Sequence, residues 1–281
     1  MHIWAATLDE STPQAWQEVY ERGLRLVDTA TRDRLNRFYH KKDSFRGLVG
    51  SLLPRMLLKE RGIPLDKMSF GRTQSGKPYI ASATEGIEPP IAYNITHDSG
   101  VVAMAWASGG DLVGPPAYKL GVDVMKVQLP KRECFANFLD AFGDQLTPLE
   151  HRSLLPSPSE PSLPESEALY RFYLIWTLKE AYTKALGVGM GFDFKRIEYD
   201  IHQETVRVDS VLAREWKFVR FEIPHHLHNG REDTYVGVAA LSHQEQVRQD
   251  EDCRVEWRDP GPWLECWGAV EFVERALDDM S

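Results

Sequence analysis

The segment from Glu165 to Leu186 constrains the fold of this 281-residue chain more than any other. Its apolar residues recur on nearly every side of a helix, which predicts a helix that is buried almost all round. Towards its end, the stretch W-T-L-K-E-A-Y-T-K nevertheless carries Lys179, Glu180 and Lys184. An unpaired charge in a protein interior is strongly destabilising. The rest of the fold must therefore supply partners for these side chains.

A second apolar segment, G-V-D-V-M from Gly121 to Met125, contains one acid, Asp123. The segment predicts a buried strand, in which Asp123 and Met125 share a face because side chains alternate. Gly121 permits another backbone to approach closely. Asp123 therefore needs a positive partner as well.

Two interpretations of these acids stay open from the residues alone. Glu180 and Lys184, one helical turn apart, could form a simple ion pair worth about 0.3–0.5 kcal/mol. Asp123 could then pair with a lysine on a neighbouring strand or cap a turn. Alternatively, Asp123 and Glu180 together hold Mg²⁺, an ion typically bound by one or two carboxylates, substrate phosphates and water.

Composition excludes several classes of protein. The three cysteines are odd in number and widely spaced, which argues for a reducing, cytoplasmic environment and against a structural zinc site or disulfides. We expect no membrane span and see no signal peptide, because long apolar runs are absent. The net charge of −9 comes mostly from Glu245–Ser281, with eleven acidic and four basic residues, so nucleic-acid binding is not expected.

The order of the expected elements predicts an α+β fold in two halves. The Gly/Pro-rich break at 109–116 suggests an N-terminal lobe at 1–116 and a C-terminal lobe at 117–244. Each begins with a strand and continues with helices and antiparallel strands. The acidic tail at 245–281 either packs back on the body through its tryptophans or is partly mobile.

The N-terminal half contains a basic region with a helical period, Arg32 to Lys59. Pro54 is expected to kink or split this helix, because proline lacks an N–H and clashes with the preceding turn. Basic residues at the start of the region most simply form a solvated helix face. The more specific hypothesis is that these basic residues form a binding site for a small ligand that carries phosphate.

Two further segments suit phosphate groups. The turn R-T-Q-S-G-K-P (Arg72–Pro78) offers two cations and a glycine-flanked backbone. In Y-N-I-T-H (Tyr93–His97), Asn94 and Thr96 share one strand face and the histidine ends the strand. Neither segment is a Walker loop, and the chain has no G-x-G-x-x-G.

Taken in order, five motifs resemble those of the 4′-phosphopantetheinyl transferases. The similarity is to the large two-lobed type, which activates fatty-acid, polyketide and nonribosomal-peptide synthases and aminoadipate reductase. Each motif alone is short, but their order and spacing are specific. The motifs are R-F-Y-H-K-K-D-x-x-R-G-L-V-G (Arg37–Gly50), G-K-P (Gly76–Pro78), N-I-T-H (Asn94–His97), G-V-D-V (Gly121–Val124) and W-T-L-K-E-A-Y-T-K (Trp176–Lys184).

The resemblance implies two similar lobes related by pseudo-twofold symmetry, each with an antiparallel sheet packed on helices. It implies a monomeric enzyme that binds coenzyme A and Mg²⁺ in the cleft. Such an enzyme transfers 4′-phosphopantetheine to a serine of an acyl or peptidyl carrier protein and releases adenosine 3′,5′-bisphosphate. Fatty-acid, polyketide and lysine biosynthesis use such carriers. The alternatives are another coenzyme A-dependent transferase and a catalytically silent module that binds carrier proteins.

The resemblance also assigns roles to residues. Asp123 and Glu180 match the metal ligands, Lys184 matches the lysine on the pyrophosphate, and these three are the expected catalytic residues. His97 and its neighbours match the strand end that meets the 3′-phosphate of the nucleotide. Besides the catalytic three, the expected coenzyme-binding residues are Arg34, Arg72, Thr73, Gln74, Ser75, Gly76, Lys77, Asn94, Ile95, Thr96 and His97.

One position departs from the pattern of many relatives, which read G-x-D-x-E. This chain has Met125 at the place of the second acid. Relatives of the animal and fungal type share the methionine, so it does not imply lost activity, and water is expected to fill the vacant metal position. A serine hydroxyl needs a positioned base to act as a nucleophile. Glu180 is the candidate, acting directly or through water.

Overall fold

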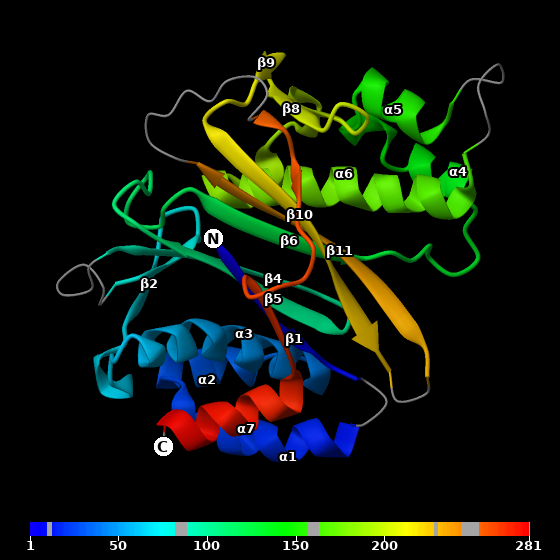
Figure 1. The fold of residues 1–281 in the computed structure, drawn as a ribbon. Helices are drawn as coiled ribbons and strands as arrows, with labels where there is room; N and C mark the ends of the chain where they lie inside the picture. Colours follow the sequence, from blue (N-terminus) through cyan, green and yellow to red (C-terminus); the bar gives the residue numbers. More distant parts are fainter. Residues whose placement is uncertain (10–12, 82–88, 157–162, 228–229, 243–252, 281) are drawn as a thin grey trace.

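The computed structural model describes the chain except for residues 10–12, 82–88, 157–162, 228–229, 243–252 and 281. Two four-stranded sheets form its centre, and helices pack on both (Figure 1). This arrangement confirms the predicted α+β class.

The two sheets have the same pattern of strand directions. Their strand orders are β13-β1-β5-β4 and β12-β10-β11-β6. In each, the first two strands are parallel and the other neighbours are antiparallel. The shared pattern agrees with two similar halves, while their pseudo-twofold relation stays a prediction. The strands are β1 (His2–Thr7), β4 (Ile91–Asp98), β5 (Val101–Ser108), β6 (Leu120–Lys126), β10 (Trp216–His226), β11 (Glu232–Ser242), β12 (Glu256–Trp257) and β13 (Leu264–Gly268).

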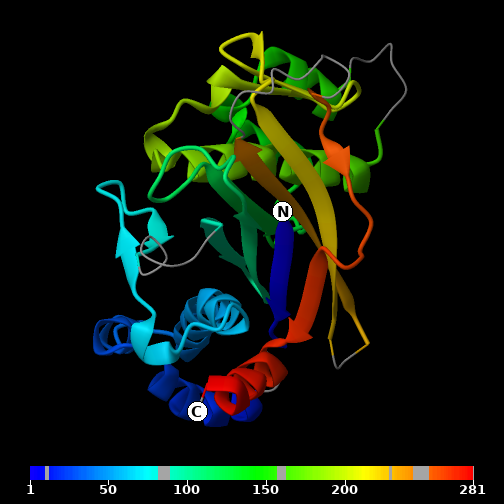
Figure 2. The same ribbon diagram turned by 60° about the vertical axis from the view of Figure 1, so that its left-hand side comes forward.

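Four helices pack with the first sheet on one side of the molecule (Figures 1 and 2). They are α1 (Pro13–Gly23), α2 (Thr29–Leu35), α3 (Lys41–Glu60) and α7 (Ala269–Met280). Their buried apolar side chains form one core with those of β1, β4 and β5. The same side carries the short helices η1 (Leu24–Leu26) and η2 (Leu65–Lys67) and the hairpin of β2 (Phe70–Arg72) and β3 (Pro78–Ile80).

The helix expected from Arg32 to Lys59 is two helices, and its break is not at Pro54. The chain leaves helix geometry between α2 and α3, whereas Pro54 lies inside α3. Proline there removes one N–H donor. Its neighbours Leu53 and Met56 are buried in the core, and this packing keeps the helix continuous.

The second sheet packs against α6 (Glu165–Leu186), which crosses it over β6 and β11 (Figure 1). The helix ends at Gly187, which adopts the left-handed conformation with φ of 71°. The remaining elements around α6 are α4 (Phe135–Asp140), η4 (Gly143–Gln145), α5 (Pro148–Leu154), η5 (Gly189–Gly191), η6 (Phe194–Arg196) and the small sheet of β7 (Ile197–Asp200), β8 (Thr205–Val208) and β9 (Val211–Leu212).

A third apolar cluster joins the two sheets. Apolar side chains from β1, β4 and β5 meet those of β6, β10 and β11 in one shared core. The two edge strands β4 and β6 therefore lie side by side, although their backbones belong to separate sheets. This contact positions the site described below.

The described part of the acidic tail, residues 253–280, packs on both sheets. Its strand β12 pairs with β10, and its strand β13 pairs with β1. Trp263 lies edge-on to Phe221, and Trp267 packs on Phe272 in α7. Of the two expectations for the tail, packing through the tryptophans is thus found for these residues, while 245–252 and 281 lie outside the described residues. The lobe boundaries themselves stay a prediction.

Candidate active site

The site begins with the close packing of α6 on β6. A Cβ atom at Gly121 would lie 2.0 Å from the carbonyl oxygen of Ala181 and 2.4 Å from the nitrogen of Ala185. Only glycine fits there, which agrees with the close backbone approach that the sequence predicted at this position. The small side chains of the two alanines let the helix lie close to the strand. Lys184 is thereby brought beside β6.

Asp123 is nearly fully buried, with 4% of its surface exposed. Its Oδ1 accepts a hydrogen bond from Lys184 Nζ at 2.6 Å and one from Thr96 Oγ1 of β4 at 2.8 Å. Lys184 Nζ also donates to Thr96 Oγ1 at 3.0 Å. Three elements of the fold thus meet at one carboxylate oxygen, and the positive partner that Asp123 needs is Lys184.

The other oxygen, Asp123 Oδ2, is buried and has no hydrogen-bond partner among the described residues. Burial raises the pKa of Asp123, and Lys184 opposes this shift. Burial and the negative charge of Asp123 raise the pKa of Glu180, so the two carboxyl groups are electrostatic neighbours. An unpaired carboxylate oxygen beside a second carboxylate suits a divalent cation.

Within the described ranges, no three His, Cys, Asp or Glu side chains come together as a metal-binding group. The predicted pair of metal ligands, Asp123 and Glu180, therefore stays a prediction in this part of the structure. Mg²⁺ is commonly held by one or two carboxylates, with phosphates and water completing its shell. The residues present fit that mode.

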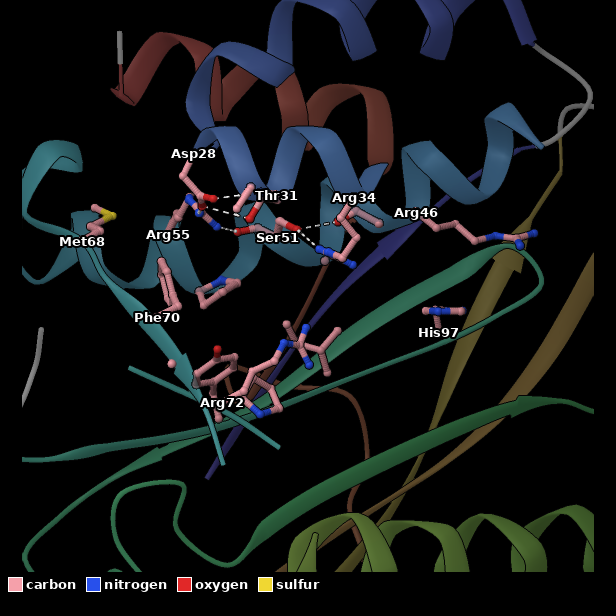
Figure 3. A pocket seen from close by; sticks show the side chains of 18 of the residues that line it. Asp28, Thr31, Arg34, Arg46, Ser51, Arg55, Met68, Phe70, Arg72 and His97 are labelled. Atoms are coloured by element: carbon pink, nitrogen blue, oxygen red, sulfur yellow. Dashed lines mark hydrogen bonds and ion pairs between the residues drawn. The ribbon is translucent and has the colours of Figure 1, made fainter. Parts of the chain in front are cut away.

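A cavity of about 1070 Å³ opens between α2, α3, the β2–β3 hairpin and β4 (Figure 3). Alternate residues of β4 line it, namely Tyr93, Ile95 and His97. Four guanidinium groups contribute to its wall, from Arg34, Arg46, Arg55 and Arg72. Among the described residues that line it, two are acids, Asp28 and Asp43. The cavity is therefore suited to an anionic ligand.

Two of these arginines are held by acids. Arg46 pairs with Asp43 at 2.7 Å. Arg55 pairs with Asp28 at 2.7 Å and lies over the ring of Phe70. Arg55 was not singled out from the sequence, and the buried helix on which it lies gave no signal that it would reach a cavity.

The other two arginines of the cavity wall, Arg34 and Arg72, are exposed. Arg34 bonds to the hydroxyl of Ser51 at 3.2 Å, and Arg72 bonds to the carbonyl of Gly76 at 2.9 Å. Burial and the nearby charge of Arg72 lower the pKa of Arg34. Desolvation, with the charges of Arg46 and Lys184, likewise lowers the pKa of His97. These cations repel one another, so an anion between them would be stabilised.

The predicted turn from Arg72 to Lys77 divides into two parts. Residues 72 and 74–76 are exposed and Thr73 is half-buried; the hydroxyls of Thr73 and Ser75 are bonded to each other, and Gly76 has a φ of 87°. Lys77 instead is buried, and its Nζ donates to the carbonyl oxygens of Tyr118 and Ala185. Burial lowers the pKa of Lys77 to about 8. Lys77 thus ties this turn to the end of α6.

The even-numbered residues of β4 face away from the cavity. Asn94 Oδ1 accepts a hydrogen bond from the Val122 N–H at 3.0 Å, and Thr96 meets Asp123. Of the predicted coenzyme-binding residues on β4, Ile95 and His97 line the cavity while Asn94 and Thr96 contact β6. These positions do not test the predicted roles, which stay predictions.

Comparison with known proteins identifies the family. Residues 119–238 match the model of the 4′-phosphopantetheinyl transferase superfamily, and residues 12–108 match that of the 4′-phosphopantetheinyl transferase N-terminal region. The chain is 44% identical over 285 residues to the 4′-phosphopantetheinyl transferase pptA of Paxillus involutus, covering 100% of both chains. The chain belongs to the 4′-phosphopantetheinyl transferases. The resemblance found in the sequence is thereby confirmed.

More distant members of the family match over shorter stretches. The L-aminoadipate-semialdehyde dehydrogenase-phosphopantetheinyl transferase of Rattus norvegicus is 29% identical over 215 residues, which are 72% of this chain and 65% of the rat protein. The 4′-phosphopantetheinyl transferase Sfp of Bacillus subtilis is 27% identical over 190 residues, 67% of this chain and 72% of its own. In this transferase, β4 and the Asp123 cluster lie within the regions matched by the two family models.

Proposed function

We propose that this transferase moves 4′-phosphopantetheine from coenzyme A to a serine of acyl or peptidyl carrier proteins. The observation that carries the proposal is the cluster of Asp123, Glu180 and Lys184 beside an arginine-lined cavity. Membership of the family supplies the reaction class. The matching strand patterns of the two sheets support the pseudo-twofold relation, which we include in the proposal.

The cavity suits the nucleotide end of coenzyme A, which carries a 3′-phosphate and a pyrophosphate. Arg34, Arg72 and His97 line this cavity, and all three are exposed. The pyrophosphate would extend towards Lys184. Among the described residues Lys184 donates to two oxygens, and a lysine ammonium has three N–H donors. One N–H therefore remains for a phosphate oxygen.

Asp123 and Glu180 are the residues that would hold Mg²⁺. The unpaired Oδ2 of Asp123 would be one of the oxygen ligands. When bound, the ion would neutralise negative charge on the pyrophosphate. Lys184 adds a fixed positive charge on the protein side, held in place by Asp123 and Thr96. Such preorganised charge stabilises the transition state because it need not reorient during the reaction.

The proton of the attacking serine must go to a base. Glu180 is half-buried, and its raised pKa makes it a better proton acceptor than an exposed carboxylate. The serine oxygen forms a bond to the phosphorus that bears pantetheine, the bond from that phosphorus to the bridging oxygen breaks, and adenosine 3′,5′-bisphosphate leaves. Glu180 takes the serine proton, directly or through one water.

A catalytically silent module that binds carrier proteins is the second candidate function. Mass analysis of an apo carrier protein incubated with the transferase, coenzyme A and Mg²⁺ separates the two. We expect a gain of one phosphopantetheine mass. A carrier that stays unmodified with fully folded protein would contradict the proposal. The substrates to test are carrier proteins from fatty-acid, polyketide and lysine biosynthesis. We also propose that the enzyme is cytoplasmic and monomeric.

Lys184→Ala is expected to weaken coenzyme A binding and slow transfer. Loss of one charged hydrogen bond to the pyrophosphate corresponds to about 10- to 100-fold in affinity. Calorimetric titration with coenzyme A measures the effect, and Lys195→Ala, on an exposed lysine, is the matched control. Unchanged affinity and rate in Lys184→Ala would remove the pyrophosphate role.

His97→Ala is expected to weaken binding of coenzyme A more than binding of 3′-dephospho-coenzyme A. A hydrogen bond from His97 to the 3′-phosphate would make a difference of about 5- to 10-fold between the two ligands. Competition titrations with both ligands on wild type and variant give the comparison. An equal loss for both ligands would show that His97 does not contact the 3′-phosphate.

A further inference from the structure

Among the described strands, β6 is an edge strand whose single paired neighbour is β11, so its backbone N–H groups on the other side have no strand partner there. Free N–H groups on a buried edge are costly, and they need acceptors. The adjacent strand β4 supplies them from side chains. Asn94 Oδ1 accepts from the Val122 N–H at 3.0 Å, and Asp98 Oδ2 accepts from the Lys126 N–H at 2.7 Å.

These two bonds flank the carboxylate of the site. Val122 directly precedes Asp123, and Lys126 follows three residues later. Between them, Thr96 donates to Asp123 itself. The side chains at 94, 96 and 98 thus form three cross-links from one face of β4 to β6, where the strands lie side by side (Figure 1).

The two faces of β4 have separate contacts. Tyr93, Ile95 and His97 line the large cavity, whereas Asn94 and Asp98 do not. A change at Asn94 or Asp98 can therefore alter the position of β6 without removing a group from the cavity wall. Asp98 is half-buried and Asn94 is buried, so Asp98 is the easier of the two to change without unfolding the protein.

We propose that Asn94 and Asp98 are positioning residues for the transfer reaction. They hold β6 in register against β4, so that Lys184 and Thr96 meet one oxygen of Asp123 while its other oxygen stays unpaired for a divalent cation. This inference rests on the proposed function for its effect on rate. Its structural part, the two side-chain acceptors for the N–H groups of β6, stands independently of that function.

Asp98→Ala tests the proposal, with Asp98→Asn as the conservative variant that keeps an oxygen for the Lys126 N–H. In Asp98→Ala we expect hydrogen exchange at the Lys126 amide to be about 5- to 10-fold faster, as loss of one hydrogen bond implies. Transfer at saturating coenzyme A should fall about 10- to 100-fold, the size expected for a small misplacement of a catalytic group. Asp98→Asn should restore both. Asp140→Ala, an exposed aspartate on α4, is the matched control.

Two binding measurements separate positioning from a general loss of structure. Coenzyme A affinity, measured without metal, should be unchanged in Asp98→Ala, because the cavity wall is intact. Mn²⁺ affinity, measured by water-proton relaxation with coenzyme A present, should be lower. Asn94→Ala should likewise lower Mn²⁺ affinity, with faster exchange at the Val122 amide.

Equal losses of coenzyme A affinity and rate would overturn the positioning role, as would unchanged Mn²⁺ affinity and rate. Unchanged exchange at the Lys126 amide would show that the cross-link itself is wrong. Failure of the proposed function is distinguishable, because wild-type protein would then transfer nothing while the exchange measurements would still respond to Asp98→Ala.

Discussion

Glu180→Gln is expected to abolish phosphopantetheine transfer while coenzyme A still binds. The substitution keeps the shape of the side chain and removes its ability to accept the serine proton. General-base catalysis contributes about 10²- to 10⁴-fold to a rate. Because Glu180 is also a proposed metal ligand, the loss should lie at the upper end of this range or beyond. Transfer is measured by the mass of the carrier protein, and coenzyme A binding is measured by calorimetry without metal.

The control for this experiment is Glu167→Gln on the same helix. Glu167 is exposed and pairs with Arg171 one turn on, so its loss should leave transfer unchanged. Glu180→Asp, which keeps a shorter carboxylate, should retain part of the activity only if a water can bridge the gap to the serine. Retained turnover in Glu180→Gln would exclude Glu180 as the base.

The elements that carry the site were predictable from the sequence because their signals are local. The helix from Glu165 to Leu186 has the predicted bounds, since its apolar period is uninterrupted and Gly187 ends it. The close backbone approach at Gly121 was predicted from the place of this glycine in an apolar strand. Both are properties of a single segment, and so they can be read without knowing the neighbours.

The partners of charged side chains were not predictable, because they depend on packing between distant segments. Lys77 was placed on the coenzyme by resemblance, yet its Nζ is buried against the carbonyls of Tyr118 and Ala185. The sequence predicted that the side chains of β4 alternate between two faces. It did not predict that Asn94 would face the other sheet. The continuity of α3 through Pro54 likewise depends on its buried surroundings. Pairing of β13 with β1 joins residues more than 250 positions apart, which no local pattern indicates.

The resemblance assigned Lys184 of the motif W-T-L-K-E-A-Y-T-K to the site, but it gave no role to Lys179 of the same motif. Lys184 reaches Asp123, whereas Lys179 is fully buried on another side of α6. Lys179 Nζ donates to Glu150 Oε2 at 2.6 Å and to the carbonyls of Gln145 and Phe194. Three bonds need three N–H donors, so Lys179 is protonated here, although burial lowers its pKa.

The carboxylate of Glu150, like the ammonium group of Lys179, has hydrogen-bond partners within the protein. It is fully buried and accepts hydrogen bonds from the N–H groups of Thr147 and Tyr199 as well as from Lys179. The Thr147 bond closes the capping box of α5. Burial raises the pKa of Glu150, and Lys179 opposes that shift. The pair thus fastens α5, α6 and β7 together, and each charge depends on the other.

Lys179→Met is therefore expected to lower the free energy of unfolding by roughly 3–5 kcal/mol, because it leaves a buried carboxylate without its cation. Urea denaturation measures the change. Lys179→Met combined with Glu150→Gln should recover part of the loss, since neither charge then remains unpaired. Glu167→Ala, which breaks the exposed pair with Arg171, should cost about 1 kcal/mol at most. A loss below 1 kcal/mol in Lys179→Met, or no recovery in the double variant, would contradict the assignment of Lys179 to stability. At temperatures where Lys179→Met is folded, its coenzyme A affinity should equal that of the wild type, because its side chain points away from the Asp123 cluster.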